Sequence, residues 1–320
     1  MQDKTQISVI GAGLMGHGIA QVFAAGGHLV RVYDPDYAAL SSVRDRVRRN
    51  LEDLGEDATA AELVFPVEDL GECVSGADVV IEAGPENLEL KRKLFLQLEL
   101  MAPARAILAS NTSVIPITHI VQDLKTAGRA MGTHWWNPPY LVPLVEVVKT
   151  VRTEEAAAQR MFDLLVAVGK TPAMVLKDIP GFIGNRLQHA LWREAIALVA
   201  DDVCDAETVD TVVKASFGRR LAVLGPLENA DLVGIDLTRA IHETVLPAID
   251  RTPGPSPYLD FLLNAGRLGM KTGHGFRRWD SKQQSELRAR VLAHLKAMDA
   301  SEKQQRAADA SVEKLSAETR

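Results

Sequence analysis

The first 35 residues alternate between short apolar runs and glycine-rich turns. Residues 6–10 are β-branched and apolar and lead directly into Gly11, which predicts a buried parallel strand that ends at a turn. Residues 16–25 follow with apolar side chains at helical spacing, and residues 29–33 form a second apolar run that ends at Asp34. A strand, a helix and a strand within about 30 residues make a complete βαβ unit.

The same alternation continues beyond this unit. Helical periodicity over 38–54 and 87–101 separates further apolar runs, and strands that alternate with helices are typical of a doubly wound sheet. We therefore predict an α/β Rossmann-type domain. Its further strands are expected at 63–66, 77–83, 106–110, 129–136 and 142–149.

The pattern changes near residue 178, after which strand-like runs are almost absent. Residues 181–200, 206–216 and 235–250 have helical spacing, so the second half is predicted to be all-α. We place a Rossmann domain at 1–179 and a helical substrate and dimerisation domain at 180–298. The highly charged residues 299–320 are predicted to form a frayed tail.

Length and composition narrow the possible functions. A chain of 320 residues with 47% hydrophobic and 24% charged residues fits two globular domains. The net charge of −6 argues against nucleic acid as the main partner. The sequence has no apolar run of about 18 residues and no signal-peptide pattern, so we expect a cytoplasmic protein without a membrane partner. Its two cysteines form no CxxC pair, and no metal site is expected.

A glycine motif marks a nucleotide site between the first strand and the first helix. Gly11, Gly13 and Gly16 match G-x-G-x-x-G and enclose Leu14 and Met15, so these five residues are predicted to bind the cofactor. Asp34 ends the next strand, where its carboxylate is expected to accept hydrogen bonds from the ribose hydroxyls. Pro35 follows in place of an arginine that would hold a 2′-phosphate, and NAD is therefore predicted rather than NADP.

Candidate chemistry comes from a histidine and a glutamate twelve residues apart. His134 lies where a predicted strand meets a loop, and Glu146 is flanked by valines, which predicts burial. A buried carboxylate needs a partner, and a histidine supplies one. The pair suits a general base that removes a hydroxyl proton from a small-molecule substrate during hydride transfer. A purely structural hydrogen bond is the alternative.

Nine ordered segments resemble the L-3-hydroxyacyl-CoA dehydrogenase family over about residues 5–280: GAGLMG, Asp34, GPEN, SNTS, HWWNPP, LVEVV, PGFIGNR, LGPLE and KTGHGF. The resemblance implies that His134 is the catalytic base and Glu146 its partner. Ser113 and Asn185 would bind the substrate oxygens, and Trp135 would belong to an aromatic wall of the substrate site. The helical domain would form a homodimer. Four residues would line the cofactor side, namely Glu86, Lys91, Asn137 and Lys271, and Glu86 would also pair with Arg186 to clamp the domains.

The sequence departs from CoA-specific members of this family between the second and third strands. Those members carry a long, lysine-containing hairpin there, whereas residues 34–63 are short and contain no lysine. Four arginines, Arg44, Arg46, Arg48 and Arg49, offer an alternative site for a CoA phosphate, although a solvated helix face is the plainer interpretation. The substrate is therefore predicted to be a 3-hydroxyacyl-CoA or a free hydroxy acid of the carnitine or gulonate type.

Two other readings of the resemblance receive little support. A non-catalytic, crystallin-like protein would have lost His134 or Glu146, and both are present. A lysine-catalysed hydroxy acid dehydrogenase would carry a lysine within 181–200, and that stretch contains none.

Overall fold

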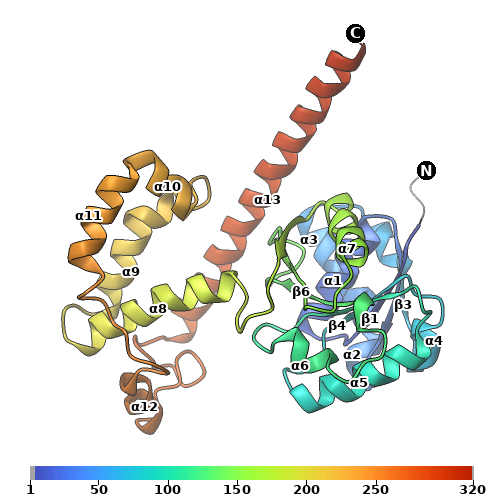
Figure 1. Cartoon of the computed structure of the whole chain (residues 1–320), viewed down its shortest axis with the longest axis horizontal. Coiled ribbons are helices and arrows are strands. Elements are labelled where there is room, and N and C mark those ends of the chain that lie inside the picture. Colours follow the sequence, from blue (N-terminus) through green and yellow to red (C-terminus); the bar gives the residue numbers. More distant parts are fainter. Residues whose placement is uncertain (1–3, 319–320) are drawn as a thin grey trace. The chain divides into compact units, whose positions relative to one another are not determined.

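The structure is a computed structural model, which describes residues 4–318. It divides into two compact units (Figure 1). The first unit combines Met1–Arg186 with Ala293–Arg320, and the second is Leu187–Leu292. The first unit thus extends seven residues beyond the predicted boundary, because the turn after residue 179 is hydrogen-bonded to the sheet.

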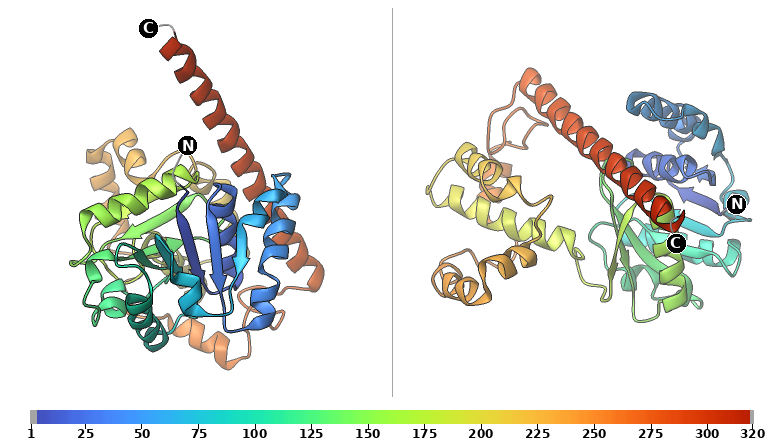
Figure 2. Two further views of the ribbon diagram at one scale, coloured as in Figure 1. Left: turned by 90° about the vertical axis from the view of Figure 1, so that its right-hand side faces the viewer. Right: turned by 90° about the horizontal axis from the view of Figure 1, so that it is seen from above.

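An eight-stranded sheet forms the centre of the first unit, in the order β3-β2-β1-β4-β5-β6-β7-β8. In the left view of Figure 2, its blue strands lie side by side between helices. Strands β1 to β6 are parallel, whereas β7 runs antiparallel to β6 and parallel to β8. This is the predicted doubly wound α/β architecture with an added antiparallel pair. The strands are β1 (Gln6–Ile10), β2 (Leu29–Tyr33), β3 (Val64–Pro66), β4 (Val79–Glu82), β5 (Ile107–Ser110), β6 (Ala130–Trp135), β7 (Leu144–Val148) and β8 (Thr171–Val175).

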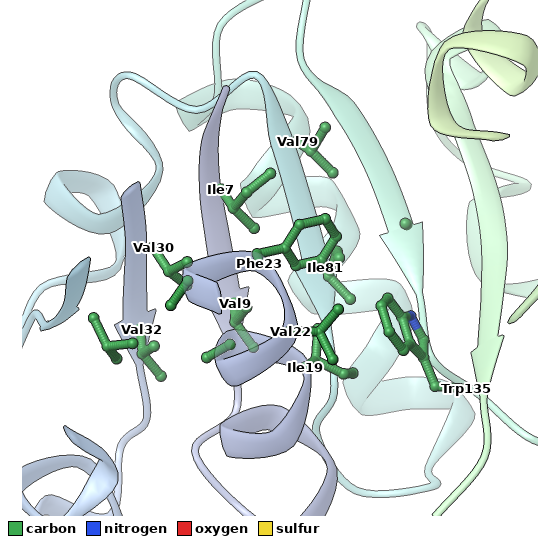
Figure 3. Close-up of a cluster of buried hydrophobic side chains, with 14 of the residues drawn as sticks. Ile7, Val9, Ile19, Val22, Phe23, Val30, Val32, Val79, Ile81 and Trp135 are labelled. Carbon is green, nitrogen blue, oxygen red and sulfur yellow. The ribbon is translucent and has the colours of Figure 1, made fainter. Parts of the chain in front are cut away.

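Both faces of the sheet are buried because successive apolar side chains point to opposite sides. Ile7 and Val9 of β1 pack into one cluster with Phe23, which Figure 3 shows lying against the sheet. Ile10 belongs to a second cluster on the other face, together with Phe95. The continuous apolar runs read from the sequence are therefore strands covered on both sides.

Helices cover both faces. One face carries α1 (Leu14–Ala25), α3 (Val43–Leu54) and α7 (Glu155–Ala167), and the other carries α4 (Leu70–Val74), α5 (Leu88–Met101) and α6 (Ile117–Val121). The helical pattern over 38–54 splits into α2 (Tyr37–Ser41) and α3 at Ser42. Two short 3₁₀ helices complete the unit, η1 (Ala58–Leu63) and η2 (Ala127–Arg129).

The regular elements of the second unit are helices in the part that the structure describes, and isolated β-bridges join His274 to Gly269 and Arg278. Its elements are α8 (Gly184–Ala200), which starts in the first unit, α9 (Ala206–Ala215), η3 (Phe217–Arg219), α10 (Pro226–Val233), α11 (Ile235–Val245) and α12 (Pro257–Asn264). Over residues 4–318, no helix combines the length and the apolarity that crossing a membrane requires.

The charged C-terminal segment differs from the expected frayed tail. Helix α13 (Ser281–Glu318) continues through it, and only residues 319–320 of the predicted tail lie outside the described residues. Lys296 Nζ donates to the carbonyl of Asp53, Lys303 pairs with Glu56, and Arg306 donates to the carbonyl of Gly169. The mixed charges thus bind the helix to the surface of the first unit, a tertiary contribution that charge pattern alone does not reveal.

Candidate active site

Two of the three glycines in the loop between β1 and α1 have a specific steric reason. Gly11 has φ +112°, and a Cβ there would lie 2.7 Å from the carbonyl oxygen of Ala83. A Cβ on Gly16 would lie 1.7 Å from the carbonyl oxygen of Gly11, so only glycine allows α1 to approach the strand. Gly13 instead faces open space, with no atom within 4 Å of its Cβ position. The loop is therefore packed on the protein side and open on the ligand side.

The N-terminus of α1 suits a pyrophosphate. No side chain caps the helix at Gly13, and its first turn contains no acidic residue, so the free N–H groups and the helix dipole favour an anion. Leu14 is 65% exposed at this end, and Met15 is partly buried. These features fit a dinucleotide whose phosphates lie over Gly13.

Asp34 is oriented by two backbone amides. Its Oδ2 accepts a hydrogen bond from Ala12 N at 2.6 Å, and its Oδ1 accepts one from Asp36 N at 2.8 Å. The carboxylate thereby joins the end of β2 to the glycine-rich loop. Each oxygen retains a lone pair for a ribose hydroxyl.

Arg46 is a member of this site that sequence reasoning missed. The sequence pattern places it with its neighbours on a charged helix face, but its guanidinium donates to the carbonyls of Ala12 and Ala39. Burial lowers the pKa of Arg46, and the charge of Arg49 lowers it further, whereas Asp34 acts in the opposite direction. The Ala12 peptide is therefore held from both ends, at its N–H by Asp34 and at its carbonyl by Arg46.

His134 and Glu146 form a buried pair across β6 and β7. The antiparallel register places the two residues directly opposite each other, and His134 Nδ1 lies 2.7 Å from Glu146 Oε2. The other carboxylate oxygen of Glu146, Oε1, accepts hydrogen bonds from Ile183 N at 2.8 Å and Gly184 N at 3.0 Å. Burial alone would raise the pKa of Glu146, but these hydrogen bonds outweigh it and hold the pKa below its ordinary value.

A second buried network supports the segment SNTS at the carboxyl edge of the sheet. Lys91 Nζ pairs with Glu82 Oε1 at 2.7 Å, and Ser110 Oγ donates to Glu82 Oε2 at 2.6 Å. Lys91 is only 1% exposed, so its ammonium stabilises this network rather than lining a cofactor surface, contrary to the prediction. Burying this charge is tolerable because Glu82 is buried beside it.

Glu86 orients the predicted substrate-binding serine. Its Oε1 accepts hydrogen bonds from the hydroxyl of Thr112 and from the backbone of Ser113 and Val114. Asn185 Nδ2 donates to the carbonyl of Ser113 at 2.8 Å, so the structure brings these two predicted residues together.

The predicted clamp between Glu86 and Arg186 is not among the ion pairs of the described residues. Glu86 is instead 3.6 Å from Lys91, measured between Oε2 and Nζ. The carboxylate thus contributes to the order of the SNTS segment.

Trp135 does not line the substrate site, and this prediction is wrong. Its side chain is 2% exposed and packs edge-on against Phe23 in the core (Figure 3). Side chains alternate along a strand, so the residue on the same side as His134 is Trp136, whose ring centroid lies 5.2 Å from that of His134. The alternation of side chains along a strand therefore indicates, from the sequence alone, that Trp136 and not Trp135 lies on the same side as His134.

The connection between β6 and β7 is fixed by a buried lysine. Lys170 is 8% exposed and donates to the carbonyls of Pro139 and Val142. Burial lowers its pKa to about 8.

Asn137, predicted to lie on the cofactor side, is exposed in this connection between β6 and β7. Lys271 belongs to the second unit, and its cofactor contact stays a prediction.

Family models match almost the whole described chain. Residues 6–179 match the NAD binding domain of 3-hydroxyacyl-CoA dehydrogenase, and residues 181–279 match the C-terminal domain of the same enzyme. The chain belongs to the 3-hydroxyacyl-CoA dehydrogenase family. It is thus an NAD-binding oxidoreductase of this family, as the sequence motifs predicted.

Members of this family with different substrates are similarly close to the chain. It is 34% identical over 288 residues to 5-formyl-3-hydroxy-2-methylpyridine 4-carboxylate 5-dehydrogenase of Mesorhizobium japonicum, covering 88% of this chain and 93% of the relative. It is 36% identical over 287 residues to human mitochondrial hydroxyacyl-coenzyme A dehydrogenase, covering 84% and 90%. A crystal structure of a 5-formyl-3-hydroxy-2-methylpyridine 4-carboxylic acid 5-dehydrogenase, described as an NAD⁺-dependent dismutase, superposes with a TM-score of 0.85 at 33% identity, covering 92% of this chain and 97% of that one.

The role of Arg46 in this family member can be tested by Arg46→Met. Loss of a hydrogen bond to a charged group costs about 1.5–3 kcal/mol, so the Kd of NADH should rise roughly 10- to 100-fold while kcat at saturating cofactor changes little. NADH fluorescence titration measures the Kd, and Arg49→Met on the exposed side of the same helix is the control. Equal affinities for the two variants would contradict the assignment.

Proposed function

We propose that this protein oxidises a hydroxyl-bearing carbon of a small acid with NAD, and that His134 is the general base. One observation carries the proposal: a buried imidazole is joined to an ionised carboxylate at the edge of the sheet that holds the glycine-rich loop. Ligands of open α/β sheets bind at this edge.

The residues divide the work of the reaction. NAD, when bound, accepts the hydride from the substrate carbon. His134 takes the hydroxyl proton at Nε2, because Nδ1 faces Glu146. Glu146 stabilises the imidazolium that results, and it keeps its charge because two backbone amides hold its second oxygen. Ser113 and Asn185, joined by a hydrogen bond, hold the substrate oxygens.

We further propose that the substrate is a free acid rather than a CoA thioester. Three of the four arginines that offer an alternative site for a CoA phosphate are engaged within the protein, and the exposed Arg49 donates to the carbonyl of Asp45. Arg48 pairs with Asp45 and Glu62, and Arg44 donates to the carbonyl of Val64. The lysines that α13 brings to this region are also engaged, since Lys303 pairs with Glu56.

The relative with the pyridine carboxylate substrate supports this choice. Its name describes a free carboxylate without a thioester, and it aligns with 88% of this chain. The human relative named for hydroxyacyl-coenzyme A supports the CoA alternative, which therefore serves as the comparison in the assay below.

The dyad is tested by two isosteric variants. His134→Gln should lower kcat about 10²- to 10⁴-fold, the usual contribution of a positioned general base, with NADH affinity nearly unchanged. Glu146→Gln should also lower kcat because it removes the charge opposite the imidazolium. Steady-state kinetics and NADH titration measure both effects. Near-normal turnover of His134→Gln would mean that the base is elsewhere.

The substrate class is tested by removing the nucleotide from the thioester. We expect kcat/KM for acetoacetate or another free 3-keto acid to lie within about tenfold of the best thioester, one decade being about 1.4 kcal/mol. Acetoacetyl-CoA should be reduced no better than acetoacetyl-N-acetylcysteamine, a thioester without the nucleotide. An NADH-linked assay compares the free acid, the CoA ester and the N-acetylcysteamine ester. A preference for the CoA ester above roughly 100-fold would indicate that the substrate is a 3-hydroxyacyl-CoA.

We also propose that the second unit pairs with a second copy of the chain. In the described structure, none of helices α8, α9, α10 and α11 buries a side chain. Large apolar residues of α10 and α11 and the segment before them are 50–84% exposed: Val223, Leu227, Leu232, Ile235 and Leu237. Obligate homodimer interfaces are apolar in this way and resemble a domain core cut in half.

Leu232→Arg tests the dimer. A charge at a desolvated interface should raise the dimer Kd by about two orders of magnitude, or about 2.8 kcal/mol. Light scattering after size exclusion measures the mass over a dilution series. Leu100→Arg on α5 is the control, because Leu100 is 86% exposed on the first unit. A wild-type mass of one chain at every concentration would contradict the proposal.

A further inference from the structure

The turn that binds Glu146 has an unusual backbone. Gly181 has φ +75°, and Phe182 follows with φ +51°, a conformation that bulky residues rarely adopt. Phe182 is fully buried, and its ring centroid lies 5.6 Å from that of His134. The turn directs the next two amides, Ile183 N and Gly184 N, to the same oxygen of Glu146. Strained backbone at such a position needs support from its surroundings.

Trp136 lies against this turn and against the base. A Cβ on Gly184 would lie 2.5 Å from Cζ2 of the Trp136 ring and 3.4 Å from Glu146 Oε2. The indole therefore touches Gly184 where its N–H binds Glu146, and its ring is also beside His134. One side chain contacts both ends of the hydrogen-bond chain from the turn to the imidazole.

The indole also carries an N–H group that makes no hydrogen bond with the described residues. Trp136 Nε1 is buried and has no hydrogen-bond partner within the described residues. A smaller ring without this N–H would avoid the loss of hydration. Within the described residues the indole therefore acts through the contacts of its rings, and its six-membered ring lies beside Gly184.

We propose that Trp136 is a positioning residue for the reaction, a wedge that holds the Gly184 amide on Glu146 and keeps water from the pair of Glu146 and His134. Gly184 leaves room for the indole, because the Cβ of any other residue at this position would clash with the ring. The inference rests on the proposed role of the dyad and adds the element that keeps it aligned.

A compensating pair of substitutions tests the wedge. Gly184→Ala should lower kcat about 10- to 100-fold, because a small displacement of a positioned group has effects of this size. Phenylalanine has one ring where tryptophan has two fused rings, so its side chain does not extend as far as the benzo ring of indole, which contains Cζ2. Trp136→Phe alone should therefore lower kcat only a fewfold. The double variant should have a kcat at least tenfold higher than that of Gly184→Ala alone.

The controls separate alignment from folding and from the dyad itself. NADH affinity and melting temperature should stay near wild type in the double variant, and Gly71→Ala on α4 should leave kcat unchanged. Trp136→Leu provides a second test if Gly184→Ala fails to fold, and should lower kcat with little change in the Kd of NADH. If His134→Gln is inactive, the role of the dyad stands. In that case full activity of Gly184→Ala, or no recovery of kcat in the double variant, would overturn the proposed role of Trp136. An active His134→Gln would overturn the dyad first.

Discussion

The carboxylate of Glu146 connects parts of the chain that would otherwise be independent. One oxygen faces the imidazole of His134 within the sheet, and the other holds two amides at the start of α8. A single buried charge thus orients the base and fixes the point where the chain leaves the dinucleotide-binding unit. It stays ionised because hydrogen bonds replace the water that burial removed.

A second buried charge organises the neighbouring part of the same edge. Glu82 ends β4, pairs with Lys91 and accepts the hydroxyl hydrogen of Ser110 at the end of β5. Lys91 also lies near Glu86, which holds the backbone of Ser113. The segment that carries Ser113 therefore depends on a buried pair, Glu82 and Lys91, beneath it. Breaking a buried pair of this kind leaves an uncompensated charge, which is more costly than losing a surface contact.

Local patterns were enough to predict most of the fold and the contact between His134 and Glu146. The βαβ start, the helical second half, the glycine motif and the partnership of His134 with Glu146 all follow from spacing and burial. Strand β8 was missed because its five residues include Pro172 and because it lies at the sheet edge, where most of its side chains are only partly buried. The continuation of α13 depends on tertiary contacts with charged partners distant in sequence.

Two errors concern the direction of side chains. Trp135 and Trp136 differ only by the side of the strand they occupy, and applying the strand period from His134 would have separated them. Arg46 and Arg49 are three residues apart on α3, yet only Arg46 reaches the glycine-rich loop. Its role requires the packing of α3 beside α1, which sequence spacing does not specify.

The antiparallel pairing of β6 with β7 constrains how this protein can change by mutation. His134 faces Glu146 only in the observed register, since a shift of one residue would bring Val145 or Val147 opposite and turn the carboxylate to the far side of the sheet. The connection between these strands is held by Lys170 through two carbonyls, so its length is not free to vary. Insertions and deletions between residues 134 and 146 should therefore be purged during evolution. New substrate preferences would have to arise by side-chain replacement here, or by changes of length in other loops.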